Sequence, residues 1–202
     1  MKPLPVSKLV EILCYCGLLL VASSLTACGA AKANNRSTQS VIAPRIKNVL
    51  VMNYRGDIEI HTRAEEKVRV ETSSTGFGDT RNQAQATLDN VLVDISQDSQ
   101  TVKVQSRLID QELSDKTETN LVVYVPDGVN FEAGTGSGDV RITLPEEANF
   151  TIQLSTGKGK VTTEFPIFGE QGVTALSGVV GAQPEFQVRA NTGLGDVLVY
   201  KR

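Results

Sequence analysis

Three aspartates in a repeated glycine-containing pattern are the residues of this chain whose spacing could support metal chemistry. Asp57, Asp139 and Asp196 each stand between a glycine and an apolar residue. A calcium site built from such turns needs several oxygen ligands per ion, arranged as two ligand rows at a fixed offset. One copy of the pattern has Lys160 where the others have the acid. We therefore expect the aspartates to stabilise tight turns through Asx-type hydrogen bonds, and we expect no metal and no cofactor.

Two further motifs could be mistaken for chemical sites. His61 is the only histidine, so it lacks the second histidine or the cysteine that a metal site or an acid–base pair would need. Gly134, Gly136 and Gly138 resemble a phosphate-binding loop, but they lead into a predicted strand. A phosphate loop needs a helix whose N-terminus faces the anion. We expect neither motif to bind a ligand.

A set of charged residues near the glycines could belong to a polysaccharide-processing enzyme. Asp139 and Arg141 share one strand face, whereas Arg189 belongs to another row, and Asp196 follows a later glycine. No carboxylate pair is placed as a general acid and a general base. We expect a protein that is not an enzyme. The alternative, a carbohydrate-active β-solenoid lyase or hydrolase, stays open at this point.

The aspartates and glycines belong to a repeated strand–turn–strand unit. Its pattern is three alternating apolar residues, a small residue, Thr-Gly-x-Gly, Asp or Lys, and Val. It occurs at residues 129–142, 150–163 and 186–199, with a weaker copy at residues 49–60. The residues expected in the turns are Gly56, Asp57, Gly136, Gly138, Asp139, Gly157, Gly159, Gly193, Gly195 and Asp196.

This repetition predicts an all-β fold, because side chains that alternate with period two belong to strands with one buried face. Repeats of this length typically stack, each unit burying its apolar face against its neighbours. We expect a parallel β-solenoid or β-helix-like stack in which Phe131, Phe150 and Phe186 lie near one another, Phe131 two places later in register. One short helix is expected at residues 80–90, where Thr80 and Gln83 could form a capping box.

The N-terminal segment has the features of a secretory signal. Lys2 and Lys8 precede a short apolar run, and Leu25-Thr26-Ala27-Cys28 follows it. This tetrapeptide resembles the lipobox of bacterial lipoproteins, which implies cleavage before Cys28 and acylation of its thiol. We therefore divide the chain into a lipoprotein signal peptide (1–27), the lipidated cysteine with a flexible tether (28–44), and one β-repeat domain (45–202).

Charge and the lipobox together indicate the partners. The formal net charge of −3 argues against a nucleic-acid partner, which would require a basic patch. Anchoring in a lipid bilayer through acylated Cys28 would be durable, because two or three acyl chains hold far better than one. In Gram-negative lipoproteins an aspartate after the cysteine retains the protein in the inner membrane. Gly29 stands there, so the resemblance implies the outer membrane if the host has one.

The domain as a whole resembles the bacterial "putative adhesin" family of β-strand-repeat domains, a relative of auto-transporter adhesin head domains. The resemblance rests on residues 51–60 (V-x-N-x-x-G-D-I-x-I), on the Val-Pro-Asp-Gly turn at 125–128, and on Gly-Ser-Gly-Asp-Val at 136–140. Lys160 and residues 174–183 depart from the pattern. The resemblance implies a solenoid-like fold, no catalytic residues, and adhesion to an envelope protein or a polysaccharide.

The anchor can be tested directly. Replacing Cys28 by Ser should leave an unprocessed precursor of higher mass, because the acylated thiol is lost. The variant should also leave the detergent phase in phase partitioning. Unchanged partitioning would refute acylation at Cys28.

Overall fold

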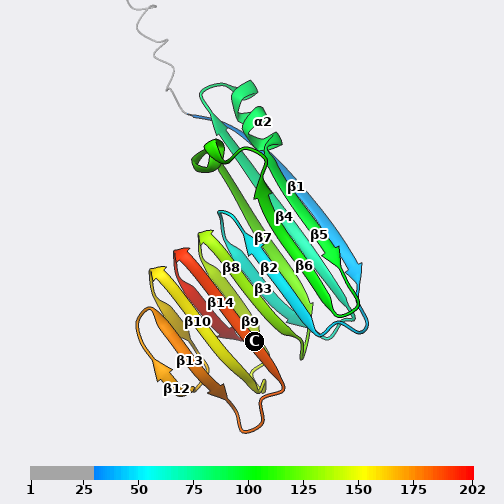
Figure 1. Cartoon of the computed structure of the whole chain (residues 1–202), viewed down its shortest axis with the longest axis vertical. Helices are drawn as coiled ribbons and strands as arrows, with labels where there is room; N and C mark the ends of the chain where they lie inside the picture. Colours follow the sequence, from blue (N-terminus) through cyan, green and yellow to red (C-terminus); the bar gives the residue numbers. More distant parts are fainter. Residues whose placement is uncertain (1–29) are drawn as a thin grey trace, which may run out of the picture. The chain divides into compact units, whose positions relative to one another are not determined.

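Alternating apolar side chains build two facing β-sheets in the computed structural model, which describes residues 30–202 (Figure 1). The predicted signal peptide (1–27) and Cys28 lie outside the described residues. Residues Ala31–Arg202 form one compact unit. Among the helices of the described part, none has the length and apolar character needed to cross a bilayer. The prediction of an all-β fold is confirmed.

Both sheets are open, and their strand orders differ from the order of the chain. The seven-stranded sheet has the order β1 (Ala31–Ile42), β4 (Lys67–Gly78), β7 (Thr117–Pro126), β3 (Ile58–Arg63), β9 (Val140–Leu144), β15 (Val197–Lys201) and β11 (Val161–Thr163). The eight-stranded sheet has the order β12 (Phe168–Gln171), β13 (Ala175–Val180), β10 (Phe150–Lys158), β14 (Phe186–Leu194), β8 (Asn130–Ser137), β2 (Asn48–Asn53), β6 (Thr101–Leu108) and β5 (Val91–Gln97).

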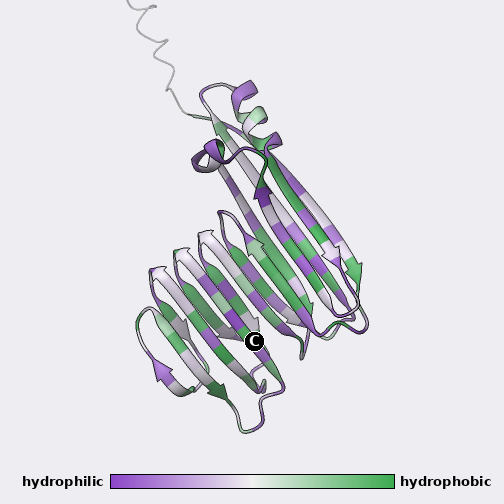
Figure 2. Ribbon diagram, in the orientation of Figure 1, coloured by the Kyte–Doolittle hydropathy of each residue, from purple (hydrophilic) through white to green (hydrophobic). Residues whose placement is uncertain are grey.

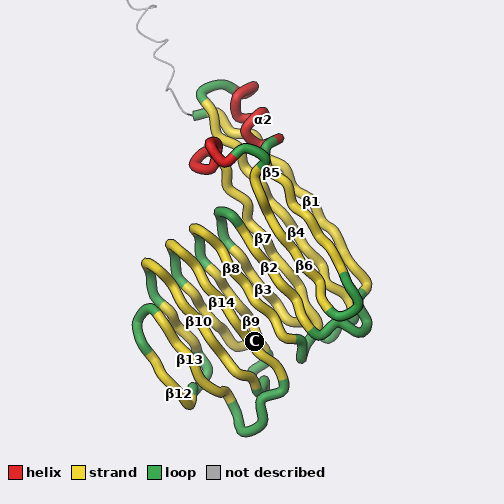
Figure 3. The backbone as a smooth tube through the Cα atoms, in the orientation of Figure 1, coloured by secondary structure: helices red, strands yellow, loops and turns green. Residues whose placement is uncertain are grey.

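Each copy of the repeat contributes one strand to each sheet. The first strands of the copies (β2, β8, β10, β14) lie in the eight-stranded sheet, and the second strands (β3, β9, β11, β15) lie in the seven-stranded sheet. These repeat strands pair in parallel, whereas β1, β5, β12 and β13 pair antiparallel toward the sheet edges. The Gly-containing turns therefore follow one another along one side of the unit (Figure 3).

The expected parallel solenoid is not what the described residues form. Both sheets are mixed, and the copies do not stack in chain order, because β14 lies between β8 and β10. The chain first runs from β10 into the β12–β13 hairpin, and β13 pairs antiparallel with the outer side of β10. The inner side of β10 is then left for β14, whose apolar pattern and turn match those of both neighbours.

The core consists of the inward-facing members of the alternation, and hydropathy alternates visibly along the central strands (Figure 2). Phe150 and Phe186 are in register and their rings stack at a centroid distance of 5.4 Å. Phe131 pairs with Val188, two places later than Phe186, as the repeat register predicts. Phe165, which the sequence analysis did not single out, packs edge-on against Phe150.

The predicted helix is present as α2 (Arg81–Asp89). Thr80 is its N-cap and forms the expected capping box with Gln83, whose side chain reaches back to the main chain of Thr80. Ala84 and Leu88 pack against Ala33 of β1 in a small cluster separate from the main core. The expectation of a single helix was wrong, because residues 111–116, between β6 and β7, form a 3₁₀ helix, η1 (Gln111–Lys116).

The tether predicted at residues 28–44 is largely a strand. Ala31–Ile42 pairs antiparallel with β4 along its whole length and forms the edge of the seven-stranded sheet. Most of its side chains are exposed, so its sequence lacks the apolar alternation by which buried strands are predicted. The strand is formed by main-chain pairing, which a polar sequence also permits.

The turns between the two sheets require glycine for two reasons. Gly56, Gly138, Gly159 and Gly195 adopt φ values of 114°, 133°, 155° and 140°, which residues with a side chain rarely adopt. In addition, a Cβ on Gly195 would overlap the carbonyl oxygen of Gly138, and the same relation holds between Gly138 and Gly56. Adjacent turns therefore touch through their main chains.

Replacing Gly195 by Ala should destabilise the unit by roughly 3 kcal/mol or more. Backbone strain of about 1–2 kcal/mol adds to overpacking of about 1–3 kcal/mol. Gly128→Ala is the matched control, because Gly128 also has positive φ (76°) but has no atom near its added Cβ. It should cost only the strain of about 1–2 kcal/mol. Urea unfolding measures both, and equal losses would refute the contact between turns.

Candidate functional site

The repeated aspartates come together in one row across the turns. The strand register aligns the turn of β2–β3 with that of β8–β9, then that of β14–β15, and last that of β10–β11. In this order the row reads Asp57, Asp139, Asp196 and Lys160. The structure thus gathers the predicted turn residues, which are far apart in sequence, along one line.

Each carboxylate in the row accepts a hydrogen bond from the main chain of the next turn. Asp57 Oδ1 accepts from the Asp139 N–H (2.9 Å), Asp139 Oδ1 from the Asp196 N–H (2.9 Å), and Asp196 Oδ1 from the Lys160 N–H (2.8 Å). Asn120 provides the same contact at the other end, accepting from the Asp57 N–H (2.7 Å). We call this set of residues (Asn120, Asp57, Asp139, Asp196) the aspartate row. The bonds join neighbouring turns, whereas an Asx turn closes on its own main chain.

Lys160 stands in the last turn, at the position that an aspartate occupies in the other three. Among the described residues, no repeat turn follows on its outer side to which a carboxylate could bond. The strand that begins directly after Lys160, β11, is the edge of the seven-stranded sheet. An acid there would have no main-chain N–H of a following repeat to accept from. A lysine on an edge strand also discourages pairing with another chain.

Arg141 forms ion pairs with two members of the row. Its Nη1 lies 2.7 Å from Asp57 Oδ2, and its Nη2 lies 2.6 Å from Asp139 Oδ2. The hydrogen bond to Asp57 raises the pKa of Arg141, although partial burial acts in the opposite direction. The guanidinium is therefore charged and holds two carboxylates that would otherwise repel each other.

A second row, of threonines, joins the same turns from inside the unit, and the sequence analysis did not assign it a role. Thr135 donates to the Gly56 carbonyl (3.0 Å), Thr192 to the Gly138 carbonyl (2.8 Å) and Thr156 to the Gly195 carbonyl (2.8 Å). The three full copies of the repeat all have threonine before Gly-x-Gly, and this recurrence was the sequence signal for the threonine row. The motif as a whole thus forms turn-to-turn hydrogen bonds.

These contacts leave the turn residues little capacity for metal or acid–base chemistry. Within residues 30–202 no group of three or more histidine, cysteine, aspartate or glutamate side chains is placed to hold a metal ion. Arg189 projects from β14 in the eight-stranded sheet. Arg141 belongs to β9 in the seven-stranded sheet, and Asp139 lies in the turn directly before β9. Of the four residues considered as an enzymatic set, Asp139, Arg141 and Asp196 lie together at the turns, and Arg189 lies apart.

His61 lies on the outer face of the seven-stranded sheet. Its ring stacks on Tyr124 at 5.3 Å, and its Nε2 lies 2.8 Å from Glu59 Oε1. Arg69 covers the same tyrosine ring at 4.0 Å. The histidine belongs to a packed surface cluster.

The outer face of the eight-stranded sheet is the other candidate site, and no motif pointed to it. Three shallow depressions, with cavity volumes of about 240, 220 and 170 Å³, lie on it. The first and second share Glu132 and Arg189, and the second and third share Gln153 and Ser155. The depressions are thus continuous and run across β2, β8, β14, β10 and β13. We call this surface the amide face.

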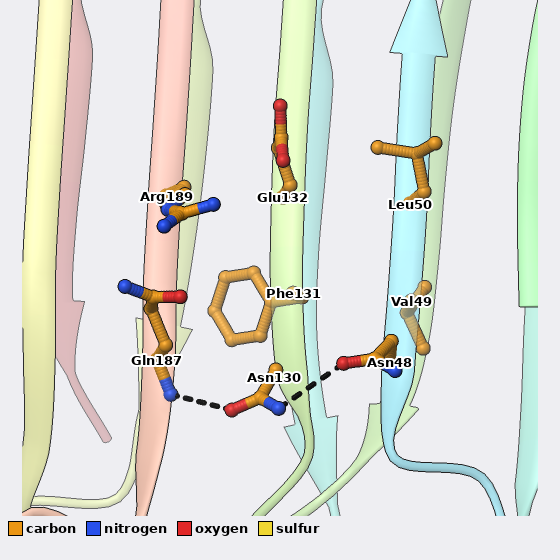
Figure 4. Close-up of a pocket in the computed structure, with 8 residues that line it drawn as sticks. All are labelled: Asn48, Val49, Leu50, Asn130, Phe131, Glu132, Gln187 and Arg189. Atoms are coloured by element: carbon orange, nitrogen blue, oxygen red, sulfur yellow. Dashed lines mark hydrogen bonds between the residues drawn. The ribbon is translucent and has the colours of Figure 1, made fainter. Parts of the chain in front are cut away.

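Amide side chains line its first depression (Figure 4). The Gln187 N–H donates to Asn130 Oδ1 (2.9 Å), and Asn130 Nδ2 donates to Asn48 Oδ1 (3.1 Å). Arg189, Glu132 and Leu50 form the next row, two residues further along the same strands. These outward positions vary between the copies of the repeat, so periodicity does not reveal them.

The aspartate row can be tested through stability. Asp139→Ala removes the bond to the Asp196 N–H and the ion pair with Arg141, and should cost about 1–2 kcal/mol at this partly exposed site. Asp139→Asn should cost less, because the amide oxygen can still accept. Lys160→Ala should stay within about 0.5 kcal/mol. An Asp139→Ala variant as stable as Lys160→Ala in urea unfolding would contradict the role of the row.

Comparisons with known proteins found distant structural likeness. No family model and no curated protein matches the chain. A solved structure described as a "putative cell adhesion protein", from Clostridium sporogenes, is 11% identical, with 84% of this chain and 100% of that chain covered and a TM-score of 0.45. A "putative lipid binding protein" from Parabacteroides distasonis is 11% identical, covering 82% and 58%, with a TM-score of 0.34. A "putative adhesin" from Bacteroides fragilis is 8% identical, covering 82% and 97%, with a TM-score of 0.23.

Proposed function

We propose that this chain is a non-catalytic binding module of the bacterial cell envelope, held at a membrane by lipid on Cys28. It binds an envelope partner through the amide face. The observation that carries the proposal is the contrast between two sets of polar groups. The charged and hydroxyl groups of the repeat are engaged in turn-to-turn bonds, whereas those of the amide face point outward from a continuous depression.

The shape of the amide face favours binding over catalysis. Each of its depressions is smaller than the roughly 300–1,000 Å³ typical of enclosed small-molecule sites. Hydrolysis of a glycosidic bond would need two carboxyl groups on either side of the bond. Glu132 is the carboxylate shared by the first two depressions, and Glu170 lies in the third, beyond Gln153. An open surface with separated acids suits recognition of an extended partner.

The anchor rests on the lipobox, residues 25–28. Because β1 begins at Ala31, only Gly29 and Ala30 would stand between the lipidated cysteine and the first strand. The three Cα–Cα steps from Cys28 to Ala31 span about 10 Å at most. A lipid on Cys28 would therefore hold the start of β1 close to the bilayer surface, and the freedom expected from a longer tether is lost.

Liposomes carrying the full chain should co-sediment with cell-envelope fragments of the producing bacterium, and empty liposomes should not. Ser155 is exposed and borders two of the depressions. Ser155→Trp should therefore block the face and weaken binding at least about tenfold, the effect of losing roughly 1.4 kcal/mol. Ser37 is also an exposed serine, on β1, so Ser37→Trp is the matched control and should bind normally.

Two results would contradict the proposal. Binding that survives Ser155→Trp would show that the amide face is not the binding surface. Release of sugar from the fragments by the wild-type chain, abolished in Asp139→Asn, would show an enzyme.

A further inference from the structure

We propose that the amide face binds a linear, uncharged oligosaccharide whose long axis crosses the strands. This inference deepens the proposed function and rests on it for the choice of surface. The partner it names is a glycan segment of the envelope, and a protein partner is an outcome that the test below would reveal.

The depressions have the direction that a linear chain requires. They follow one another across β2, β8, β14, β10 and β13, so the line that joins them crosses the strands. Neighbouring strands lie about 4.8 Å apart, so side chains at one register position repeat at that interval. A polymer lying across the strands would meet a polar side chain on each, whereas a compact ligand would fill only one shallow depression.

The first row of side chains is oriented before any ligand binds. The Gln187 N–H is a main-chain group that can only donate, so the atom of Asn130 that faces it must be the oxygen. Asn130 Nδ2 therefore points to Asn48, whose oxygen accepts, and the Nδ2 of Asn48 lies on the side away from Asn130 (Figure 4). Side chains that are already ordered lose little entropy on binding, which favours affinity.

The second row offers one cation, one anion and an amide. Gln153, Arg189 and Glu132 occupy matching positions on β10, β14 and β8. Within the described residues, neither Arg189 nor Glu132 takes part in an ion pair. Arg189 can only donate and Glu132 can only accept, whereas a sugar hydroxyl does both. The row is neutral overall and therefore matches hydroxyl groups better than a charged polymer.

An aromatic ring stands at the end of the first row. The register position of Gln187 continues across the sheet to Thr151 on β10, Val179 on β13 and Phe168 on β12. The Phe168 side chain is 74% exposed on this outer face. An exposed aromatic ring beside hydroxyl and amide groups gives the apolar face of a sugar ring a surface to pack on.

The composition of the face also argues against a protein partner. The centre of a protein–protein interface is usually apolar, rich in aromatic residues, and poor in charge. Here the centre of the depressions carries Arg189, Glu132 and Gln153, and the exposed ring of Phe168 lies outside their lining, on β12. Charged and amide side chains therefore stand at the middle of the surface that a ligand would cover.

The test uses the full chain in detergent micelles and three linear hexasaccharides, of β1,4-glucose, β1,4-N-acetylglucosamine and α1,4-galacturonate, measured by titration calorimetry. We expect at least one of the two neutral probes to bind more tightly than the acidic one. Arg189→Ala should weaken binding about tenfold, the usual effect of losing one hydrogen bond to a charged group. Gln187→Ala keeps the main-chain N–H and removes the side-chain amide that lines the first depression, and it should weaken binding about threefold.

Arg36→Ala and Gln39→Ala are the matched controls, because both residues are exposed on β1 in the other sheet. They should bind the neutral probe like the wild-type chain, and thermal unfolding should show all four variants folded. Equal binding by every variant would overturn the assignment of the face. A second outcome separates the two proposals. If none of the three probes binds, but liposomes carrying the chain bind envelope fragments and Arg189→Ala abolishes that binding, the glycan assignment is wrong and the proposed function stands. Failure of the liposome binding itself would defeat the proposed function.

Discussion

Main-chain contact between adjacent turns is the constraint on which the rest of the structure depends. Parallel strands in both sheets lie about 4.8 Å apart, and every repeat must cross between the sheets without widening that spacing. Glycine makes this crossing feasible at Gly138 and Gly195, where a side chain would meet the carbonyl of the neighbouring turn. Once the turns touch, the hydroxyl of Thr192 and the carboxylate of Asp139 are within reach of the adjacent main chain. One short motif therefore sets the register of both sheets together.

The elements governed by local rules were predictable from the sequence. The capping residues of α2 and the register of Phe150 with Phe186 follow from side-chain chemistry and periodicity that act within a short stretch of chain. β1 was not predictable in this way, because most of its side chains face solvent and its stability comes from main-chain bonds to β4. A strand held mainly by main-chain pairing leaves no periodic pattern in its sequence.

The order of the strands could not be predicted for a related reason. Copies with the same apolar pattern and the same turn can pair with one another in any order, so the motif does not distinguish the neighbours of β14. The hairpin β12–β13 makes the distinction, because it pairs with one side of β10 and leaves the other side open. Residues 174–183, where the repeat fades, are thus the part of the chain that contains β13. A break in the pattern determined the topology that the pattern itself left undecided.

The same reasoning explains why the candidate binding surface escaped a search for motifs. Positions that must satisfy the turn contacts are restricted to a few residue types, and they recur. Outward positions on the strands meet no such restriction, so successive copies carry Asn48, Asn130, Thr151 and Gln187 at one register position. A stack that needs only its turns and its inward side chains leaves its outer faces free to differ from copy to copy. Recognition of a partner in a fold of this kind therefore depends on the residues that do not repeat.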